Sequence, residues 1–117
     1  MKILNSLSTA EKRRIRKAVI PQLERYRILK SVGKMNEEQK AFCSEIEQAI
    51  EILPVIEKSL ITTRYTNPEA EYMTDYKFYN NYMNPPVSEK TYNRIRDNAM
   101  FKISLRLGVE TGVEISV

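Results

Sequence analysis

Apolar residues recur three and four positions apart through most of this chain, which is the spacing of one face of an α-helix. The first such stripe consists of Ile15, Val19, Ile20, Leu23, Tyr26 and Leu29. The stretch from Ser8 to Glu11 has the form of a capping box and predicts that this helix begins near Thr9. Gly33 is expected to end the helix. Pro21 is expected to kink it or to split it in two.

The same signals predict a second and a third helix. Asn36 can cap the second, with Gln39 as its partner in a capping box. The apolar positions of the second helix are Phe42, Ile46, Ile50 and Leu53. Pro54 either ends this helix or lies in the first turn of the next one. We expect the third helix to run to about Tyr65, with an apolar face of Leu53, Ile56, Leu60 and Ile61.

Residues 66–72 are expected to form a loop, and two more helices are predicted after it. Thr74 can cap a short helix that runs to about Tyr82, and a turn over residues 84–87 follows. Ser88 can cap the final long helix, whose inner face is Tyr92, Ile95, Ala99, Met100, Ile103 and Leu107. Gly108 is expected to end that helix. Only three glycines occur in 117 residues, so the pattern as a whole predicts an all-α fold.

The residue types that most enzymes need are missing. The chain has no histidine and a single cysteine, Cys43, so it lacks the commonest general base and a cysteine cage for zinc. None of its glycines belongs to a phosphate-cradling loop. We therefore expect neither an enzyme nor a bound cofactor or metal. No apolar run is long enough to span a membrane, and the N-terminal apolar stretch is too short for a secretory signal, which predicts a cytoplasmic protein.

Charge is distributed unevenly along the chain. Residues 1–34 hold ten basic and two acidic residues, a net charge of +8. Residues 35–75 hold three basic and nine acidic residues, a net charge of −6, and residues 76–117 hold six basic and four acidic residues, a net charge of +2. Two basic ends around an acidic middle suggest two surfaces that face phosphate. Solvated helix faces are an equally good interpretation for any one segment.

A short helix, a tight turn and a longer helix follow one another in residues 74–107, which is the order of a helix-turn-helix. The second helix of that motif enters the major groove of DNA with its N-terminal part nearest the bases. The predicted DNA-binding residues are Ser88, Glu89, Lys90, Thr91, Asn93, Arg94, Asp97 and Lys102. Arg94 can pair with guanine and Asn93 with adenine. The predicted phosphate contacts are Arg13, Arg14, Arg16, Lys17, Lys77 and Arg96. A basic outer face is also common in helical bundles that bind no DNA.

Several short strings, taken in order, resemble a known family. They are Thr63-Arg64-Tyr65, the stretch from Thr74 to Tyr79, the stretch from Ser88 to Arg94, Ala99, and the stretch from Leu105 to Val109. Their order and spacing make residues 53–109 resemble the ArpU family of phage-encoded transcriptional regulators. The family usually has a short turn with a glycine before the serine, where this chain has Asn84 and an inserted Pro85-Pro86. Asparagine can take the left-handed conformation of that glycine.

The resemblance implies a DNA-binding half like region four of sigma factors and a role in expressing late phage genes, in the cytoplasm of a bacterial host. It also implies that Glu89, Lys90, Asn93 and Arg94 take the base-reading positions. We therefore expect a basic and acidic helical region over residues 1–52, a DNA-binding domain over 53–109 and a tail over 110–117. The expected partner is double-stranded DNA, and the N-terminal helices are candidates for contact with flanking phosphate, RNA polymerase or a second copy of the chain.

Two other functions fit the same features. A small terminase subunit also joins a helix-turn-helix to an oligomerising helical region, and it would bind DNA at a packaging site. A sigma-like module that binds RNA polymerase or a host regulator would instead have no affinity for duplex DNA. Its partner-facing surface would be the acidic middle of the chain, with Glu37, Glu38, Glu45, Glu47, Glu51 and Glu57.

Overall fold

A computed structural model describes residues 7–70, 73–75, 77–78 and 87–113. Its regular elements are α1 (Thr9–Val32), α2 (Glu37–Glu51), α3 (Val55–Ile61), the π-helical turn η2 (Thr62–Thr66) and α5 (Glu89–Leu107). Every regular element in these described ranges is helical, which confirms the predicted all-α class. Within the same ranges, no helix is both long and apolar enough to cross a membrane.

Helix α1 begins and ends where its local chemistry predicts. The Ser8 hydroxyl accepts a hydrogen bond from the Glu11 backbone N–H at 3.1 Å, and the Glu11 carboxylate accepts one from the Ser8 N–H at 3.0 Å. Gly33 ends the helix with a φ of 83°, in the left-handed region. Pro21 does not split the helix in two. Proline has no backbone N–H, so the carbonyl of Lys17, four residues earlier, lacks its usual hydrogen bond within the helix. Both Pro21 and Lys17 are exposed, so water can bond that carbonyl instead.

The structure confirms one prediction for α2 and corrects one for α3. The predicted capping box at the start of α2 is present, with Asn36 and Gln39 exchanging hydrogen bonds of 2.8 and 3.0 Å. Pro54 lies directly before α3, and the helical path continues through η2. The prediction that Ile56 faces the core is wrong, because Ile56 is 52% exposed while its neighbour Glu57 is buried.

Helix α5 has the predicted limits. The Ser88 hydroxyl accepts a hydrogen bond from the Thr91 N–H at 3.1 Å, and Gly108 ends the helix with a φ of 65°. Five of the six predicted inner positions are buried, and Leu107 packs partly buried against the core. Upstream of α5, Thr74 caps a helical turn, since its hydroxyl accepts a hydrogen bond from the Lys77 N–H at 3.1 Å. The predicted end of that short helix and the turn after it lie outside the described residues.

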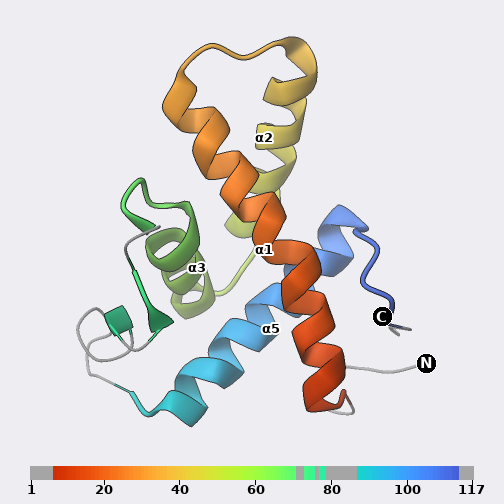
Figure 1. Cartoon of the computed structure of the whole chain (residues 1–117), viewed down its shortest axis with the longest axis vertical. Coiled ribbons are helices and arrows are strands. Elements are labelled where there is room, and N and C mark those ends of the chain that lie inside the picture. The colour runs from red at the N-terminus through yellow and green to blue at the C-terminus, as the bar shows by residue number, and fades with distance from the viewer. Residues whose placement is uncertain (1–6, 71–72, 76, 79–86, 114–117) are drawn as a thin grey trace.

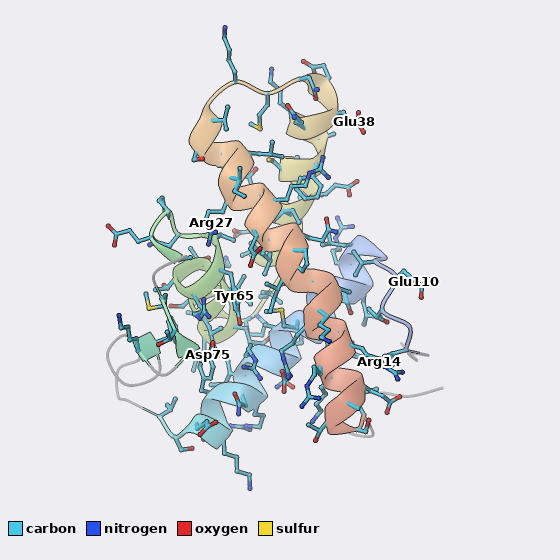
Figure 2. All side chains as sticks on the ribbon, in the orientation of Figure 1. Arg14, Arg27, Glu38, Tyr65, Asp75 and Glu110 are labelled. Atoms are coloured by element: carbon cyan, nitrogen blue, oxygen red, sulfur yellow. The ribbon has the colours of Figure 1, made fainter. Side chains whose placement is uncertain are left out.

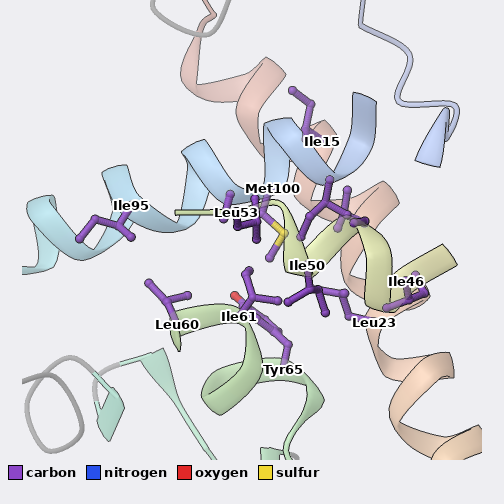
Figure 3. Close-up of a cluster of buried hydrophobic side chains, with 14 of the residues drawn as sticks. Ile15, Leu23, Ile46, Ile50, Leu53, Leu60, Ile61, Tyr65, Ile95 and Met100 are labelled. Atoms are coloured by element: carbon purple, nitrogen blue, oxygen red, sulfur yellow. The ribbon is translucent and has the colours of Figure 1, made fainter. Parts of the chain in front are cut away.

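The helices pack in two layers around one hydrophobic core. The chain measures 40 × 36 × 21 Å, and its shortest dimension is about the thickness of two packed helices. Helix α1 crosses α5, and its second half forms a hairpin with α2 (Figure 1). The core joins residues of all these helices, among them Ile15, Leu23, Ile46, Ile61 and Met100 (Figure 3). The domain division expected between residues 52 and 53 therefore falls inside a continuous core, which includes Leu53.

Candidate nucleic-acid interface

The first turns of α5 and the start of α1 enclose a surface hollow of about 610 Å³. Five of the eight predicted DNA-binding residues line it: Lys90, Thr91, Asn93, Arg94 and Asp97. The remaining lining residues are Thr9 and Lys12 of α1 and Asn98 of α5. The two helix starts lie at the same end of the molecule, below the point where α1 crosses α5 (Figure 1). The hollow is therefore a product of tertiary packing between the two ends of the chain.

Positive charge prevails in this hollow. Three of its side chains are cationic, Lys12, Lys90 and Arg94, and none of them has an ion pair among the described residues. The one carboxylate in its lining, Asp97, is held 2.8 Å from Arg16 Nη1. Both α1 and α5 begin at this hollow, and the N-terminus of a helix carries a partial positive charge. The arrangement favours an anion.

The hollow also contains side chains that can form hydrogen bonds with uncharged groups of a ligand. Arg94 is exposed, and Asn93 and Asn98 are half-buried, so an amide and a guanidinium from adjacent positions of α5 face the same space. Ser88 and Glu89 precede them and are exposed. The hydroxyls of Ser88 and Thr91 bond each other at 3.1 Å, which fixes the start of the helix. An amide and a guanidinium are the side-chain groups that pair with base edges in two places at once.

Arg96 lies in the interior and not on the outer face of α5. It is only 8% exposed, its Nε is 3.3 Å from Asp97 Oδ1, and its Nη1 is 3.4 Å from Asp75 Oδ2. Burial lowers the pKa of the guanidinium, but the carboxylates of Asp97 and Asp75 outweigh it and raise the pKa. Arg96 thus pairs with two carboxylates of the protein itself, and its predicted contact with a DNA phosphate stays a prediction.

Asp97 and Arg16 are predicted from the sequence to face DNA from the outer surface, but both are largely buried. Their side chains are 13% and 19% exposed, and they bond each other between α5 and α1. Fewer positions of α5 face solvent than helical periodicity alone predicts, because α1 packs over the side of α5 that contains Asp97. Arg16 belongs to the packing between the helices, whereas the neighbouring Arg13, Arg14 and Lys17 are exposed. Figure 2 shows Arg14 near the lower end of α1. Lys77 is exposed as well and does not line the hollow.

Lys102 has a partner within the protein. Its ammonium group lies 3.0 and 3.1 Å from the two carboxylate oxygens of Glu57, whose side chain is 9% exposed. No sequence pattern reveals this pair, because the two residues lie on different helices far apart in the chain. Lys102 does not line the hollow, and its position beside α3 separates it from Lys90 and Arg94.

Replacing Lys102 with alanine is expected to lower the free energy of unfolding by about 1–2 kcal/mol, because the buried Glu57 carboxylate loses its charged partner. The effect is moderated by solvent, since the Lys102 side chain is 42% exposed. Urea denaturation measures the change. Lys40→Ala is the control, because its pair with Glu37 is exposed on both sides and should change stability by less than about 0.5 kcal/mol. Equal effects of the two substitutions would contradict this role of Lys102.

Lys12 is a residue of the hollow that the predicted DNA-binding set omits. Sequence patterns place it on the basic N-terminal helix but give no reason to connect it with α5. Comparisons of the chain with protein-family models, with curated proteins and with solved structures give no match. The resemblance to the ArpU family therefore stays a prediction.

Proposed function

We propose that this protein binds double-stranded DNA sequence-specifically and regulates transcription. The observation that carries the proposal is the hollow between the starts of α1 and α5. There Lys12 and Lys90, which have no ion pair among the described residues, lie beside the guanidinium of Arg94 and the amide of Asn93. In this proposal α5 is the recognition helix of a sigma region-four-like helix-turn-helix that begins at Thr74. Arg94 and Asn93 read bases, and Lys12 and Lys90 contact phosphates.

The basic residues near the start of α1 support the same placement of the protein on DNA. Arg13, Arg14 and Lys17 are exposed on α1, which begins at the hollow, so phosphates that flank the recognised bases lie within reach of that helix. The resemblance to the ArpU family extends the proposal to activation of late genes of a phage, in the cytoplasm of its bacterial host. This extended proposal includes contact of the N-terminal helices with RNA polymerase and binding of two copies of the chain to one DNA site.

The decisive experiment is selection from a randomised duplex library at about 150 mM salt, near physiological ionic strength. We expect enrichment of one motif, and its symmetry would show whether one or two copies bind. Retention of duplexes without enrichment would contradict sequence-specific regulation and would favour a DNA-packaging role like that of a small terminase subunit. Failure to retain any duplex would contradict DNA binding altogether, and a pull-down of RNA polymerase would then test the remaining alternative.

Replacing Arg94 with alanine is expected to weaken binding to the enriched motif by about 1–3 kcal/mol, because one bidentate contact with a guanine is lost. The affinity for unrelated duplexes should change much less. Fluorescence anisotropy measures the affinity of each variant for a labelled duplex with the enriched motif and for an unrelated one. Arg13→Ala should weaken both affinities equally and flatten the salt dependence, since it removes a phosphate contact. The exposed Lys34, in the α1–α2 connection, provides a control: Lys34→Ala should leave both affinities unchanged.

A further inference from the structure

A second hollow, of about 380 Å³, lies on another side of α1. Four arginines line it: Arg16 and Arg27 from α1, Arg64 from η2 and Arg96 from α5. Figure 2 shows Arg27, Tyr65 and Asp75 on the same side of α1, at the edge of this hollow. The walls thus come from elements at the beginning, the middle and the end of the chain. None of the DNA-binding residues proposed on α5 lines it.

Two carboxylates, Asp75 and Asp97, pair with three of the four guanidinium groups. Asp75 lies 3.0 Å from Arg64 Nε and 3.4 Å from Arg96 Nη1, and Asp97 lies 2.8 Å from Arg16 Nη1. Arg27 is half-buried and has neither an ion pair nor a hydrogen bond among the described residues. Four cations thus line the hollow together with two carboxylates, the paired Asp75 and the exposed Glu24.

The hollow offers more donors than the protein uses. Each guanidinium carries five N–H donors, and only four hydrogen bonds from these arginines join them to described residues. Donors from three elements suit an anion with several oxygens that point in different directions. A single carboxylate presents two oxygens in one plane, which one arginine alone can satisfy. A concave site with partly buried walls also strengthens the attraction of an anion.

We propose that this second hollow binds a phosphoryl group, with Arg27 as its principal ligand and Arg16 and Arg64 as the flanking donors. The phosphoryl group belongs either to the DNA backbone or to a small phosphorylated molecule. In both cases the phosphoryl oxygens accept hydrogen bonds from the N–H groups of Arg27, which has no ion pair among the described residues. The ion pair between Asp97, which lines the first hollow, and Arg16, which lines the second, lies between the two sites.

Nuclear magnetic resonance of the isotope-labelled full chain tests the proposal, with inorganic phosphate as the probe at constant ionic strength. We expect saturable shifts of the signals around Arg27 and Arg64. Arg27→Gln should weaken phosphate binding about tenfold, the value of one charge-assisted contact. Arg14→Gln is the matched control, because it removes the same charge from an exposed site of the same helix. Circular dichroism verifies that both variants keep the helical content of the native chain.

Shifts that never saturate, or that are equally large in the Arg27 and Arg14 variants, would overturn the proposal. If a saturable site exists, the titration is repeated with an excess of duplex DNA. Displacement of phosphate from the signals around Arg27 would identify a backbone phosphate as the natural occupant. Retention of phosphate beside bound DNA would identify a small phosphorylated molecule instead. The first titration contains no DNA, so its result is independent of the function proposed for the other hollow.

Discussion

Replacing Asp75 with alanine is expected to lower the free energy of unfolding by about 3 kcal/mol, because the buried Tyr92 hydroxyl loses a short hydrogen bond and the buried Arg96 loses one of its two carboxylate partners. The carboxylate of Asp75 accepts hydrogen bonds from the Tyr92 hydroxyl at 2.6 Å, from Arg64 Nε at 3.0 Å and from Arg96 Nη1 at 3.4 Å. Tyr92 is fully buried and Arg96 is 8% exposed. Breaking a buried charged pair costs about 3–5 kcal/mol. The lower end applies because the Asp75 side chain is 44% exposed and water replaces part of the loss.

The same carboxylate affects the ionisation of Tyr92. Burial, the neighbouring Tyr65 and the hydrogen bond to Asp75 all raise the pKa of Tyr92, so the phenol stays protonated and donates to Asp75. Asp75→Asn retains an acceptor oxygen but not the charge, and its loss of stability should be intermediate. Both variants are measured by urea denaturation. Glu69→Ala is the control, because Glu69 is an exposed carboxylate of the same connecting segment and should change stability by less than about 0.5 kcal/mol. A loss below about 1 kcal/mol for Asp75→Ala would show that solvent and the remaining protein groups, such as Asp97 for Arg96, satisfy Arg96 and Tyr92 without it.

Replacing Leu23 with alanine is expected to lower the free energy of unfolding by about 3 kcal/mol. Leu23 has no exposed surface and belongs to the core that joins α1 to α2 and η2 (Figure 3). Its truncation removes buried apolar surface and leaves a cavity, since residues of three elements surround the site. Thermal and urea unfolding measure the change. The matched control is Ile28→Ala on the same helix, because Ile28 is 56% exposed and should cost less than about 1 kcal/mol.

The Leu23 variant also tests how far the two hollows depend on the position of α1. That helix contributes Lys12 to the first hollow and Arg16 and Arg27 to the second. Loosening α1 should therefore weaken DNA binding and phosphate binding together, at temperatures where the variant is still helical by circular dichroism. Ile28→Ala should leave both unchanged. Equal losses of stability in the two variants would contradict the role of Leu23 in the hydrophobic core.

The helix limits of this protein follow from its sequence because they depend on neighbouring residues. A capping side chain bonds a backbone N–H three positions away, as Ser8, Asn36 and Ser88 do. The left-handed ends of α1 and α5 need a residue that tolerates a positive φ, and glycine is present at both. The apolar stripe likewise identifies most buried positions of α1 and α5, because 3.6 residues complete one turn.

The tertiary structure alone decided which charged residues face solvent. Helical spacing puts Arg96 and Asp97 outside α5 and Ile56 inside α3, but the packing of α1, the segment around Asp75 and Lys102 reverses these assignments. An opposite charge from a distant part of the chain makes a buried arginine or glutamate tolerable, as Asp75 does for Arg96 and Lys102 does for Glu57, because the pair is neutral where the single charge is costly. Local spacing contains no information about that distant partner. The sequence by itself therefore determined where the helices begin and end, and the tertiary structure decided which of their charges remain free to bind an anion.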